Sequence, residues 1–215
     1  MRWFMIFMML ITSPTYADKQ AITEDGETVI LKDDGTWFIT PNAKGDLSNQ
    51  VFRNATWGMS KSQVKITEKE KPKSEDDSFL VYVGKVAGMN ALIIYVFVDN
   101  KLVRAKYSFI ENNSNRNDNI TDYNNLKKLF EKKYAKPKED KFIWKNDLYR
   151  DNSSEWGFAV SLGHLLFYSQ WETSNTVITL TLSGENHRTE LVAEYYSKAL
   201  EVLEGKILRK ERANY

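Results

Sequence analysis

The alternation of hydrophobic and polar positions predicts an antiparallel β-meander between residues 79 and 110. Its three apolar segments, residues 79–88, 91–100 and 102–110, are separated by Met89-Asn90 and by a turn at residues 99–101. In the third segment, Val103, Ala105, Tyr107 and Phe109 alternate with Arg104, Lys106 and Ser108. A period of two places one face against a core and the other in water. Residues 89–97 are more continuously apolar, which predicts a central strand.

Two segments show helical signals. In residues 121–135, Tyr123, Leu126, Phe130 and Tyr134 fall on one face with Leu129 beside them, and Lys136-Pro137 ends the helix. Earlier, Ser60 and Gln63 match the S-x-x-Q capping box, in which each side chain accepts a hydrogen bond from the backbone N–H of the other residue. Met59 and Val64 occupy the two positions of a hydrophobic staple. We therefore predict a second, short helix that begins after Ser60 and ends within the charged residues 65–78.

The remaining residues predict further strands at 142–145, 157–162, 165–172 and 176–182. Turns are expected at Gly163-His164, at residues 173–175 and at residues 183–186. Two interpretations of the last segment remain open. Residues 188–196 form a strand followed by a short helix at 197–205, or a single helix runs from Thr189 onward, since Leu191, Tyr195, Ala199 and Val202 also fit helical spacing.

Together these elements predict an α+β fold with a curved antiparallel sheet built from meanders, one helix packed per half, and a small β-hairpin before it. The hairpin is expected within residues 21–39, around the turn Asp33-Asp34-Gly35. We predict a signal peptide at residues 1–17, the hairpin appendage at 18–40, a linker at 41–51, the α+β domain at 52–206 and a basic tail at 207–215. The order of elements suggests two similar halves.

The first seventeen residues have the pattern of a secretory signal peptide. Arg2 precedes an apolar run at residues 3–11, and small residues stand at Thr15 and Ala17. Cleavage is expected between Ala17 and Asp18, because nine apolar residues are far fewer than the ~20 that span a bilayer. The protein is therefore predicted to be periplasmic or secreted, with no integral membrane span after cleavage.

Charge and cysteine content exclude several classes of function. The chain has 30 Lys and Arg and 29 Asp and Glu, so loss of Arg2 with the signal peptide would leave no net charge. This balance argues against a nucleic-acid partner. The chain has no cysteine, which excludes thiol catalysis, cysteine-ligated zinc, iron–sulfur chemistry and a lipid-modified N-terminal cysteine. An exported protein without disulfides must be stabilised by its core.

No group of residues predicts a catalytic or metal site. The only histidines, His164 and His187, fall at predicted turns. Zinc needs three or four ligands, which His187 would obtain from Glu185 and Glu190 only if the loop folded around the metal. No serine stands in a G-x-S-x-G context, so a hydrolase triad is not indicated. We assign no catalytic residue, no metal ligand and no cofactor.

Aromatic residues give the best indication of a binding site. Trp156 and Tyr149 flank the polar loop of residues 145–155, and Trp171 lies further along the chain. Exposed aromatic side chains among charges are typical of contact sites for proteins or glycans. Trp156, Tyr149 and Trp171 are therefore the candidate binding residues.

Two resemblances follow from short motifs. Gly58, Met59, Ser60 and Val64, followed by Phe97, Asp99 and Leu102, resemble the small outer-membrane assembly lipoproteins of the SmpA/OmlA type and the repeat of the β-lactamase inhibitor proteins. This resemblance covers residues 52–110 and implies a shared fold and protein binding in the cell envelope, although the lipid-attachment cysteine is missing. Asp25-Gly26, Val29, Leu31 and Asp34-Gly35-Thr36-Trp37 resemble a DGxxVxLxxDGTW hairpin of exported bacterial proteins and imply no activity.

These observations support three hypotheses for the function. The first is a non-enzymatic exported module whose sheet face or loops contact another envelope protein. The second is a carrier or sensor of a small apolar ligand held between the sheet and the helix at residues 121–135. The third is a hydrolase that uses paired carboxylates such as Glu155 and Glu172, which must then converge in one cleft. The sequence assigns neither the partner nor the oligomeric state.

Overall fold

A computed structural model describes the chain as two compact units, residues 1–47 and 48–215. In the first unit it describes the backbone of residues 19–22, 28–31 and 37–40, and in the second it describes residues 51–110, 113–201 and 203, without the side chains of the first unit. The predicted signal peptide and basic tail, nearly all of the predicted linker and residues 202, 204 and 205 of the predicted closing helix lie outside these residues.

The small unit contains a three-stranded antiparallel sheet in the order β1-β2-β3. Strands β2 (Thr28–Leu31) and β3 (Trp37–Thr40) form the predicted hairpin. Strand β1 (Lys19–Ile22) pairs with the other side of β2 and was not predicted. Its four residues contain Lys19 and Gln20, so they lack the apolar alternation that identifies a strand.

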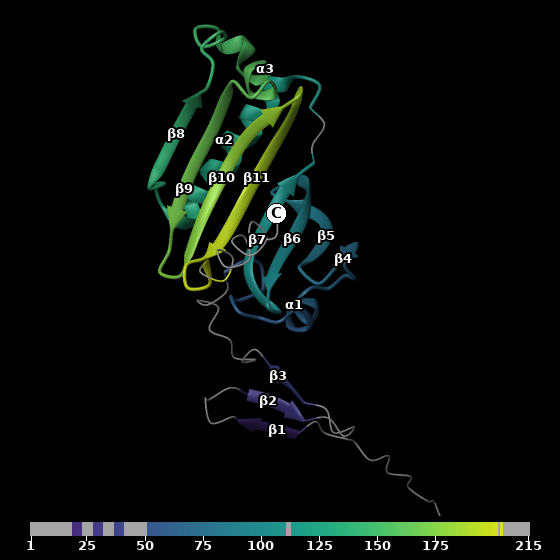
Figure 1. The fold of residues 1–215 in the computed structure, drawn as a ribbon. Coiled ribbons are helices and arrows are strands. Elements are labelled where there is room, and N and C mark those ends of the chain that lie inside the picture. Colours follow the sequence, from purple (N-terminus) through teal and green to yellow (C-terminus); the bar gives the residue numbers. More distant parts are fainter. Residues whose placement is uncertain are drawn as a thin grey trace, which may run out of the picture. The chain divides into compact units, whose positions relative to one another are not determined.

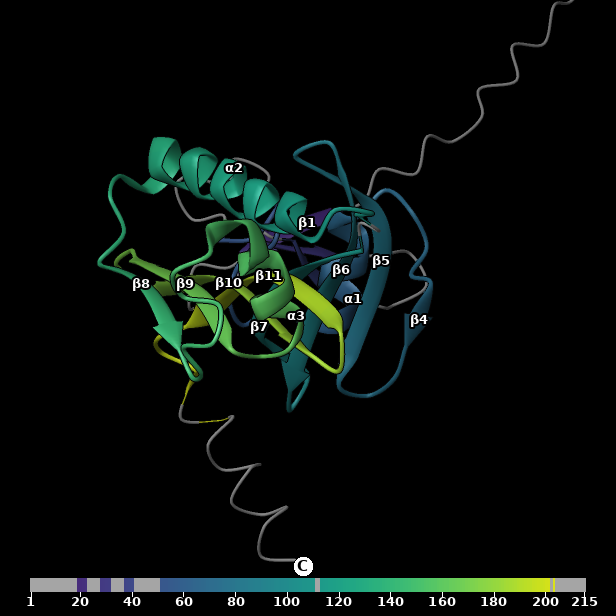
Figure 2. The same ribbon diagram turned by 90° about the horizontal axis from the view of Figure 1, so that it is seen from above.

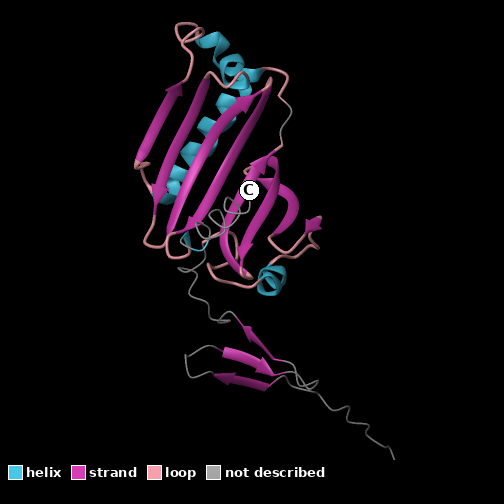
Figure 3. Ribbon diagram, in the orientation of Figure 1, coloured by secondary structure: helices cyan, strands magenta, loops and turns pink. Residues whose placement is uncertain are grey.

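The large unit is an open, eight-stranded antiparallel sheet with three helices, which confirms the predicted α+β fold class (Figures 1 and 3). The strands are β4 (Ser74–Glu75), β5 (Phe79–Val86), β6 (Met89–Val98), β7 (Lys101–Phe109), β8 (Glu139–Trp144), β9 (Leu165–Glu172), β10 (Thr176–Glu185) and β11 (Arg188–Ser197). The helices are α1 (Lys61–Thr67), α2 (Arg116–Tyr134) and α3 (Trp156–Ser161), and a 3₁₀ turn, η2 (Ser153–Glu155), precedes α3.

The strand order, β4-β5-β6-β7-β11-β10-β9-β8, divides the sheet into two halves of mirrored order. We call residues 51–110 the first half and residues 113–201 the second half. In each half a helix is followed by four strands that run in chain order from one edge of the sheet to its centre. The last strands of the two halves, β7 and β11, then pair antiparallel. The two similar halves suggested by the order of elements are therefore present in the topology.

One face of the sheet carries the core. On β10, Ile178, Leu180 and Leu182 are buried, whereas the residues between them are half-buried, as the period of two requires. Helix α2 covers this face in the second half (Figure 2). Its buried residues Tyr123 and Leu126 belong to the core cluster. In the first half, the buried Val64 of α1 belongs to the same core cluster.

The beginning of α1 confirms the predicted capping box. The backbone N–H of Gln63 donates to the Ser60 hydroxyl at 3.3 Å, and the backbone N–H of Ser60 donates to the Gln63 side chain at 2.8 Å. Met59 and Val64, the predicted staple, are both buried. The cap fixes the point at which the chain enters the core of the first half.

Two of the hairpin turns lie at other positions than predicted. Residues Met89 and Asn90 belong to β6, because the turn lies at Ala87 and Gly88, which both have positive φ. Similarly, β10 continues to Glu185 and its turn is Asn186-His187, with φ of 52° and 64°. Two-residue turns with positive φ at both positions match the twist of the strands they join. The strand at residues 188–196 is confirmed by β11, so the single-helix interpretation is wrong.

The predicted strand at residues 157–162 is also wrong, because these residues form α3 and the turn after it. The short apolar run has no period that separates a strand from a buried helix. Tertiary contacts determine the outcome: the Asn117 side chain of α2 accepts a hydrogen bond from the backbone N–H of Gly157 at 2.7 Å and donates to the carbonyl of Ser154 at 2.7 Å. Helix α2 begins at Arg116, five residues before the prediction, because Asn115 caps it.

Candidate functional site

Trp171, one of the three predicted binding residues, is a core residue. Its side chain is 1% exposed, and its indole N–H donates to the carbonyl of Ala135 at 3.0 Å. The indole ring also contacts Phe130, with ring centroids 5.3 Å apart. Trp171 therefore attaches the end of α2 to the sheet and presents no surface to a partner.

Tyr149 and Trp156 are half-buried and pack against the core rather than projecting from the surface. The indole N–H of Trp156 donates to the carbonyl of Arg150 at 3.1 Å, and its ring lies 5.8 Å from that of Trp144. The ring of Tyr149 stacks on His164 at 6.0 Å. These contacts hold the loop of residues 145–155 in place, and the most exposed apolar residue of that loop is Leu148, at 70%.

The other predicted chemical groups do not form one site. Glu172 lies at the end of β9, where hydrogen bonds from Lys138 and Lys198 lower the pKa of its carboxyl group. Glu155 precedes α3, which leads into the start of β9, whereas Glu172 is the last residue of that strand. The eight residues of β9 span about 23 Å. The structure therefore does not bring these carboxylates together. In the part of the chain that it describes, no three His, Asp or Glu side chains are grouped to hold a metal ion.

Side chains occupy the interface between α2 and the sheet. The rings of Tyr123 and Phe167 lie 5.4 Å apart, and the Tyr123 hydroxyl is hydrogen bonded to the hydroxyl of Ser169 at 2.6 Å. Burial raises the pKa of Tyr123, so this hydroxyl stays protonated near neutral pH. This filled interface does not favour the hypothesis of an apolar ligand between sheet and helix.

The opposite face of the sheet is not covered by any helix of the described residues, and we call it the open face (Figure 2). It consists of the strand positions that alternate with the buried ones. On β5 and β6 it is largely apolar, with Val81, Val83, Leu92 and Ile94, whereas β7 contributes Arg104, Lys106 and Ser108. In the second half it is polar and aromatic, with Tyr168, Gln170, Thr179, Thr181, Glu194 and Tyr196. Only the alternation in residues 102–110 predicted part of this face from the sequence.

Arg104, Glu194 and Tyr196 form a network at the centre of the open face, where β7 and β11 meet. The Arg104 guanidinium donates to the Glu194 carboxylate at 3.3 Å and lies over the ring of Tyr196, with its carbon 5.7 Å from the ring centroid. The Tyr196 hydroxyl donates to the same carboxylate. Burial and this hydrogen bond raise the pKa of Tyr196. The network fixes an arginine and a tyrosine in place on the surface, so little side-chain freedom would be lost when a partner binds.

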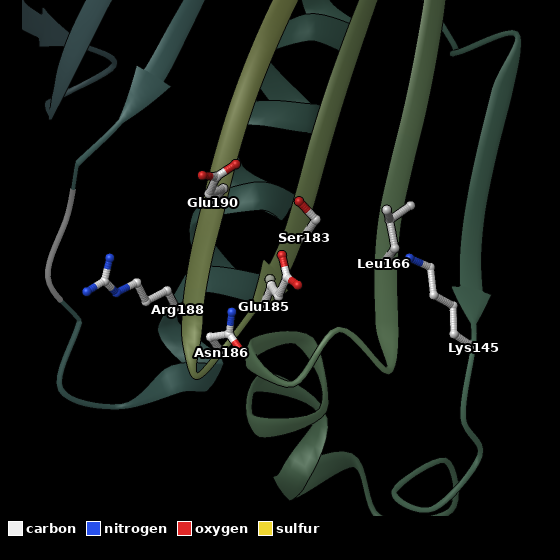
Figure 4. Close-up of a pocket in the computed structure, with 8 residues that line it drawn as sticks. Lys145, Leu166, Ser183, Glu185, Asn186, Arg188 and Glu190 are labelled. Atoms are coloured by element: carbon white, nitrogen blue, oxygen red, sulfur yellow. The ribbon is translucent and has the colours of Figure 1, made fainter. Parts of the chain in front are cut away.

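Two hollows deepen the open face in the second half. One, of about 370 Å³, lies over β9, β10 and β11 and is lined by residues that include Tyr168, Thr181 and Tyr196. The other, of about 710 Å³, lies at the end of the sheet near the β10–β11 turn (Figure 4). Ser183 and Glu185 of β10 line this hollow, and the Lys145 side chain points toward Leu166 (Figure 4). Side chains of both charges, such as Lys145 and Glu190, line this second hollow.

No protein-family model matches the chain, and no curated protein or solved structure matches it significantly. In the residues that the structure describes, no helix has the length and apolar character needed to cross a membrane. The site must therefore be interpreted from its own geometry and chemistry.

Proposed function

We propose that the protein is a non-enzymatic, exported binding module whose open face contacts another protein of the cell envelope. The observation that carries this proposal is an eight-stranded sheet with helices on one face only and two hollows in the other. Export is supported by the signal-peptide pattern of residues 1–17. The resemblance of residues 52–110 to envelope proteins of the SmpA/OmlA type is consistent with the same environment.

The dimensions of the open face suit a protein partner. Eight strands spaced by about 4.8 Å extend over roughly 34 Å, and a ten-residue strand is about 33 Å long. The face therefore offers roughly 1,000 Å², and a standard protein–protein interface buries about 800 Å² on each partner. A small metabolite would use only one of the hollows.

The side chains of the open face also suit a protein partner. Tyrosine and arginine are enriched where protein interfaces bind most strongly, and here Arg104 of β7 lies beside Tyr196 of β11, with Tyr168 two strands further on, on β9. The apolar residues of the first half extend the same face. Charges of both signs stand opposite each other on β7 and β11, as Lys106 and Glu194 do, so the face does not favour a polyanion.

A pair of arginine substitutions tests the proposal. Thr179 lies in the middle of the open face on β10, and Asn125 is exposed on α2, on the covered side of the sheet. The full chain with a C-terminal affinity tag is used to recover partners from an envelope extract of the source organism, for the wild type, Thr179→Arg and Asn125→Arg. Recovered proteins are quantified by mass spectrometry, and the binding constant of each purified partner is then measured by calorimetry.

We expect at least one envelope protein to be recovered with the wild type and with Asn125→Arg but not with Thr179→Arg. The purified pair should show an affinity loss of at least tenfold for Thr179→Arg, because a long charged side chain would be inserted into the interface. Equal recovery by the two variants would move the contact away from the open face, and failure to recover any partner would count against a binding module. Circular dichroism spectra verify that both variants are folded.

A further inference from the structure

The two edges of the sheet are completed to different extents. In the second half, the edge strand β8 pairs with β9 over six residues. In the first half, the edge strand β4 occupies the equivalent place but pairs with β5 over only Ser74 and Glu75 (Figure 1). Pro72 precedes β4 and has no backbone N–H to donate, so it cannot extend the pairing. The outer edge of β5 beyond Tyr82 therefore lacks the strand that its counterpart has.

The backbone groups along this edge can be assigned from the pairing. The carbonyl of Val81 accepts from the N–H of Lys73 at 2.7 Å, so Val81 faces outward. Because outward- and inward-facing residues alternate along an edge strand, Val83 and Lys85 also face outward. Apart from the ladder between β5 and β6, no described residue forms a hydrogen bond with the backbone of Val83 or Lys85. The edge thus presents two free N–H and two free C=O groups, and the Val83 side chain is 40% exposed.

A polar pocket of about 380 Å³ lies beside the free edge and is lined in part by residues 82–85. Its wall contains the Glu68 carboxylate, whose side chain is 6% exposed. Arg53 donates to this carboxylate at 2.8 and 3.1 Å, and the Tyr95 hydroxyl donates to it as well. The hydroxyl of Tyr82, which also lines the pocket, is buried and has no hydrogen-bond partner among the described residues. This hydroxyl is an unsatisfied donor, for which an incoming oxygen atom is the natural partner.

The surface around the edge is positively charged. Lys69, Lys71, Lys73 and Lys85 are exposed, and in the described part of the chain none of them has an ion-pair partner. Glu68 is neutralised by Arg53, and Glu70 remains the one exposed carboxylate of residues 68–73. The local charge is therefore complementary to an acidic segment.

We propose that the free edge of β5 at Val83 and Lys85 receives an extended, acidic segment of a partner protein, which pairs as an additional strand and extends the line of β4. Backbone hydrogen bonds to Val83 and Lys85 would supply the pairing. The lysines would select acidic side chains, and the pocket at Tyr82 and Glu68 would receive one side chain of the segment. This contact differs from the one proposed for the open face, since it uses the backbone groups at the edge of the sheet, although the Val83 side chain also lies on that face.

The test uses defined peptides and the full chain. A fluorescein-labelled decapeptide that alternates valine and glutamate is titrated with the protein, and its anisotropy is measured. A second peptide replaces glutamate with lysine, and a third carries proline at the two central valines to prevent backbone pairing. Amide hydrogen exchange of Val83 and Lys85 is recorded with and without the first peptide.

Two protein variants separate charge from pairing. The double reversal Lys69→Glu with Lys85→Glu is compared with Lys128→Glu with Lys132→Glu, which makes the same change in net charge on the exposed side of α2. In Val83→Pro, only an outward-facing N–H is removed, so pairing of β5 with β6 is retained. Thr179→Arg, on the open face, is included so that the results can contradict the edge proposal and the open-face proposal independently of each other.

We expect the acidic peptide to bind with a dissociation constant below 1 mM and to slow exchange at Val83 and Lys85. Affinity should fall at least tenfold with the Lys69/Lys85 reversal, with Val83→Pro and with the proline peptide, and should be unchanged with Lys128/Lys132 and with Thr179→Arg. Equal losses for the two reversals, or full binding of the proline peptide, would overturn the proposal. So would a dimer of the wild-type chain that Val83→Pro dissociates, because the edge would then bind a second copy. The proposal would also be overturned if the lysines served only to keep other sheet edges away. In that case the acidic peptide would not bind, and the Lys69/Lys85 reversal variant would self-associate.

Discussion

The two halves of the large unit share one order of elements but differ in how the core is closed. In the second half, the 19-residue helix α2 covers the sheet and the edge strand β8 has six residues. In the first half, α1 has seven residues and β4 has two. The arrangement that buries the core is thus retained in both halves, whereas the outer elements are reduced in the first. The half with reduced elements has the free edge and the polar pocket, and the half with the long helix has the hollowed face.

An aromatic cluster replaces the long helix in the first half. The ring of Phe52 lies 5.3 Å from Tyr95, 4.4 Å from Tyr107 and 5.1 Å from Tyr195. Phe52 is held by a short bridge in which the backbone N–H of Ala55 donates to its carbonyl at 3.0 Å. Burial raises the pKa of Tyr107 to about 12, so its hydroxyl stays neutral in the folded state well above the pH at which a free tyrosine ionises. Because Tyr195 belongs to β11, this cluster also joins the two halves.

Core truncations on either side give the largest expected effects. Phe52→Ala should lower the free energy of unfolding by about 3–5 kcal/mol, and Leu126→Ala by about 2–5 kcal/mol, because each leaves a cavity in the core. Guanidinium unfolding is followed by tryptophan fluorescence and by circular dichroism. We expect one cooperative transition in both variants, since a single core cluster contains both residues.

Leu129→Ala is the matched control for Leu126→Ala, since Leu129 is 46% exposed on the same helix. Its effect should remain within about 0.5 kcal/mol. Two separate transitions, with Phe52→Ala affecting one and Leu126→Ala the other, would show that the halves fold independently. That result would contradict the shared core.

The sequence predicted best those elements that are determined locally. The meander of residues 79–110, the capping box at Ser60 and the strand at residues 165–172 depend on alternation and on side chains a few positions apart. The helical state of residues 157–161 depends instead on Asn117, forty residues earlier, whose side chain bonds to Gly157. No local pattern contains that contact, so the apolar run alone predicted the wrong element.

The candidate site was harder to predict than the fold. The aromatic residues near residue 150 were sought at the surface, but Trp171 fills the core and Tyr149 and Trp156 support a loop. Aromatic content indicates burial and binding equally well, because rings serve both purposes. The free edge of β5 depends on how many residues of β4 pair with it. That number follows from the position of Pro72 relative to a strand register that only the structure gives.

A smaller effect is expected where α2 and α3 meet. A Cβ atom added at Gly157 would lie 2.4 Å from the backbone carbonyl carbon of Arg116, so the two helices would have to separate. Gly157→Ala should therefore lower the free energy of unfolding by about 1–3 kcal/mol. The measurement is again guanidinium unfolding.

Gly84→Ala is the control in the first half, where the added Cβ would lie 3.2 Å from the terminal methyl group of Ile93, which can move. We expect Gly84→Ala to be nearly neutral or slightly stabilising, because alanine loses less backbone freedom than glycine on folding. If Gly157→Ala were equally neutral, the close approach of α2 and α3 would not contribute to the stability of the second half.

The smallest expected effects on stability are those of the helix caps. Because each half has one such cap, at Ser60 and at Asn115, these substitutions allow a direct comparison of the two halves. Ser60→Ala removes the acceptor for the Gln63 N–H, and Asn115→Ala removes the acceptor for the Asn117 N–H at 3.0 Å. Each substitution should lower the free energy of unfolding by about 1 kcal/mol. We expect the same effect in the much shorter α1, because the adjacent Met59 and Val64 are buried and attach this helix to the core. Ser60→Thr keeps an acceptor and should remain close to the wild type. If Ser60→Ala left the unfolding free energy unchanged while Asn115→Ala lowered it, α1 would not contribute to the cooperative fold. The reduced first half would then depend on its aromatic cluster alone.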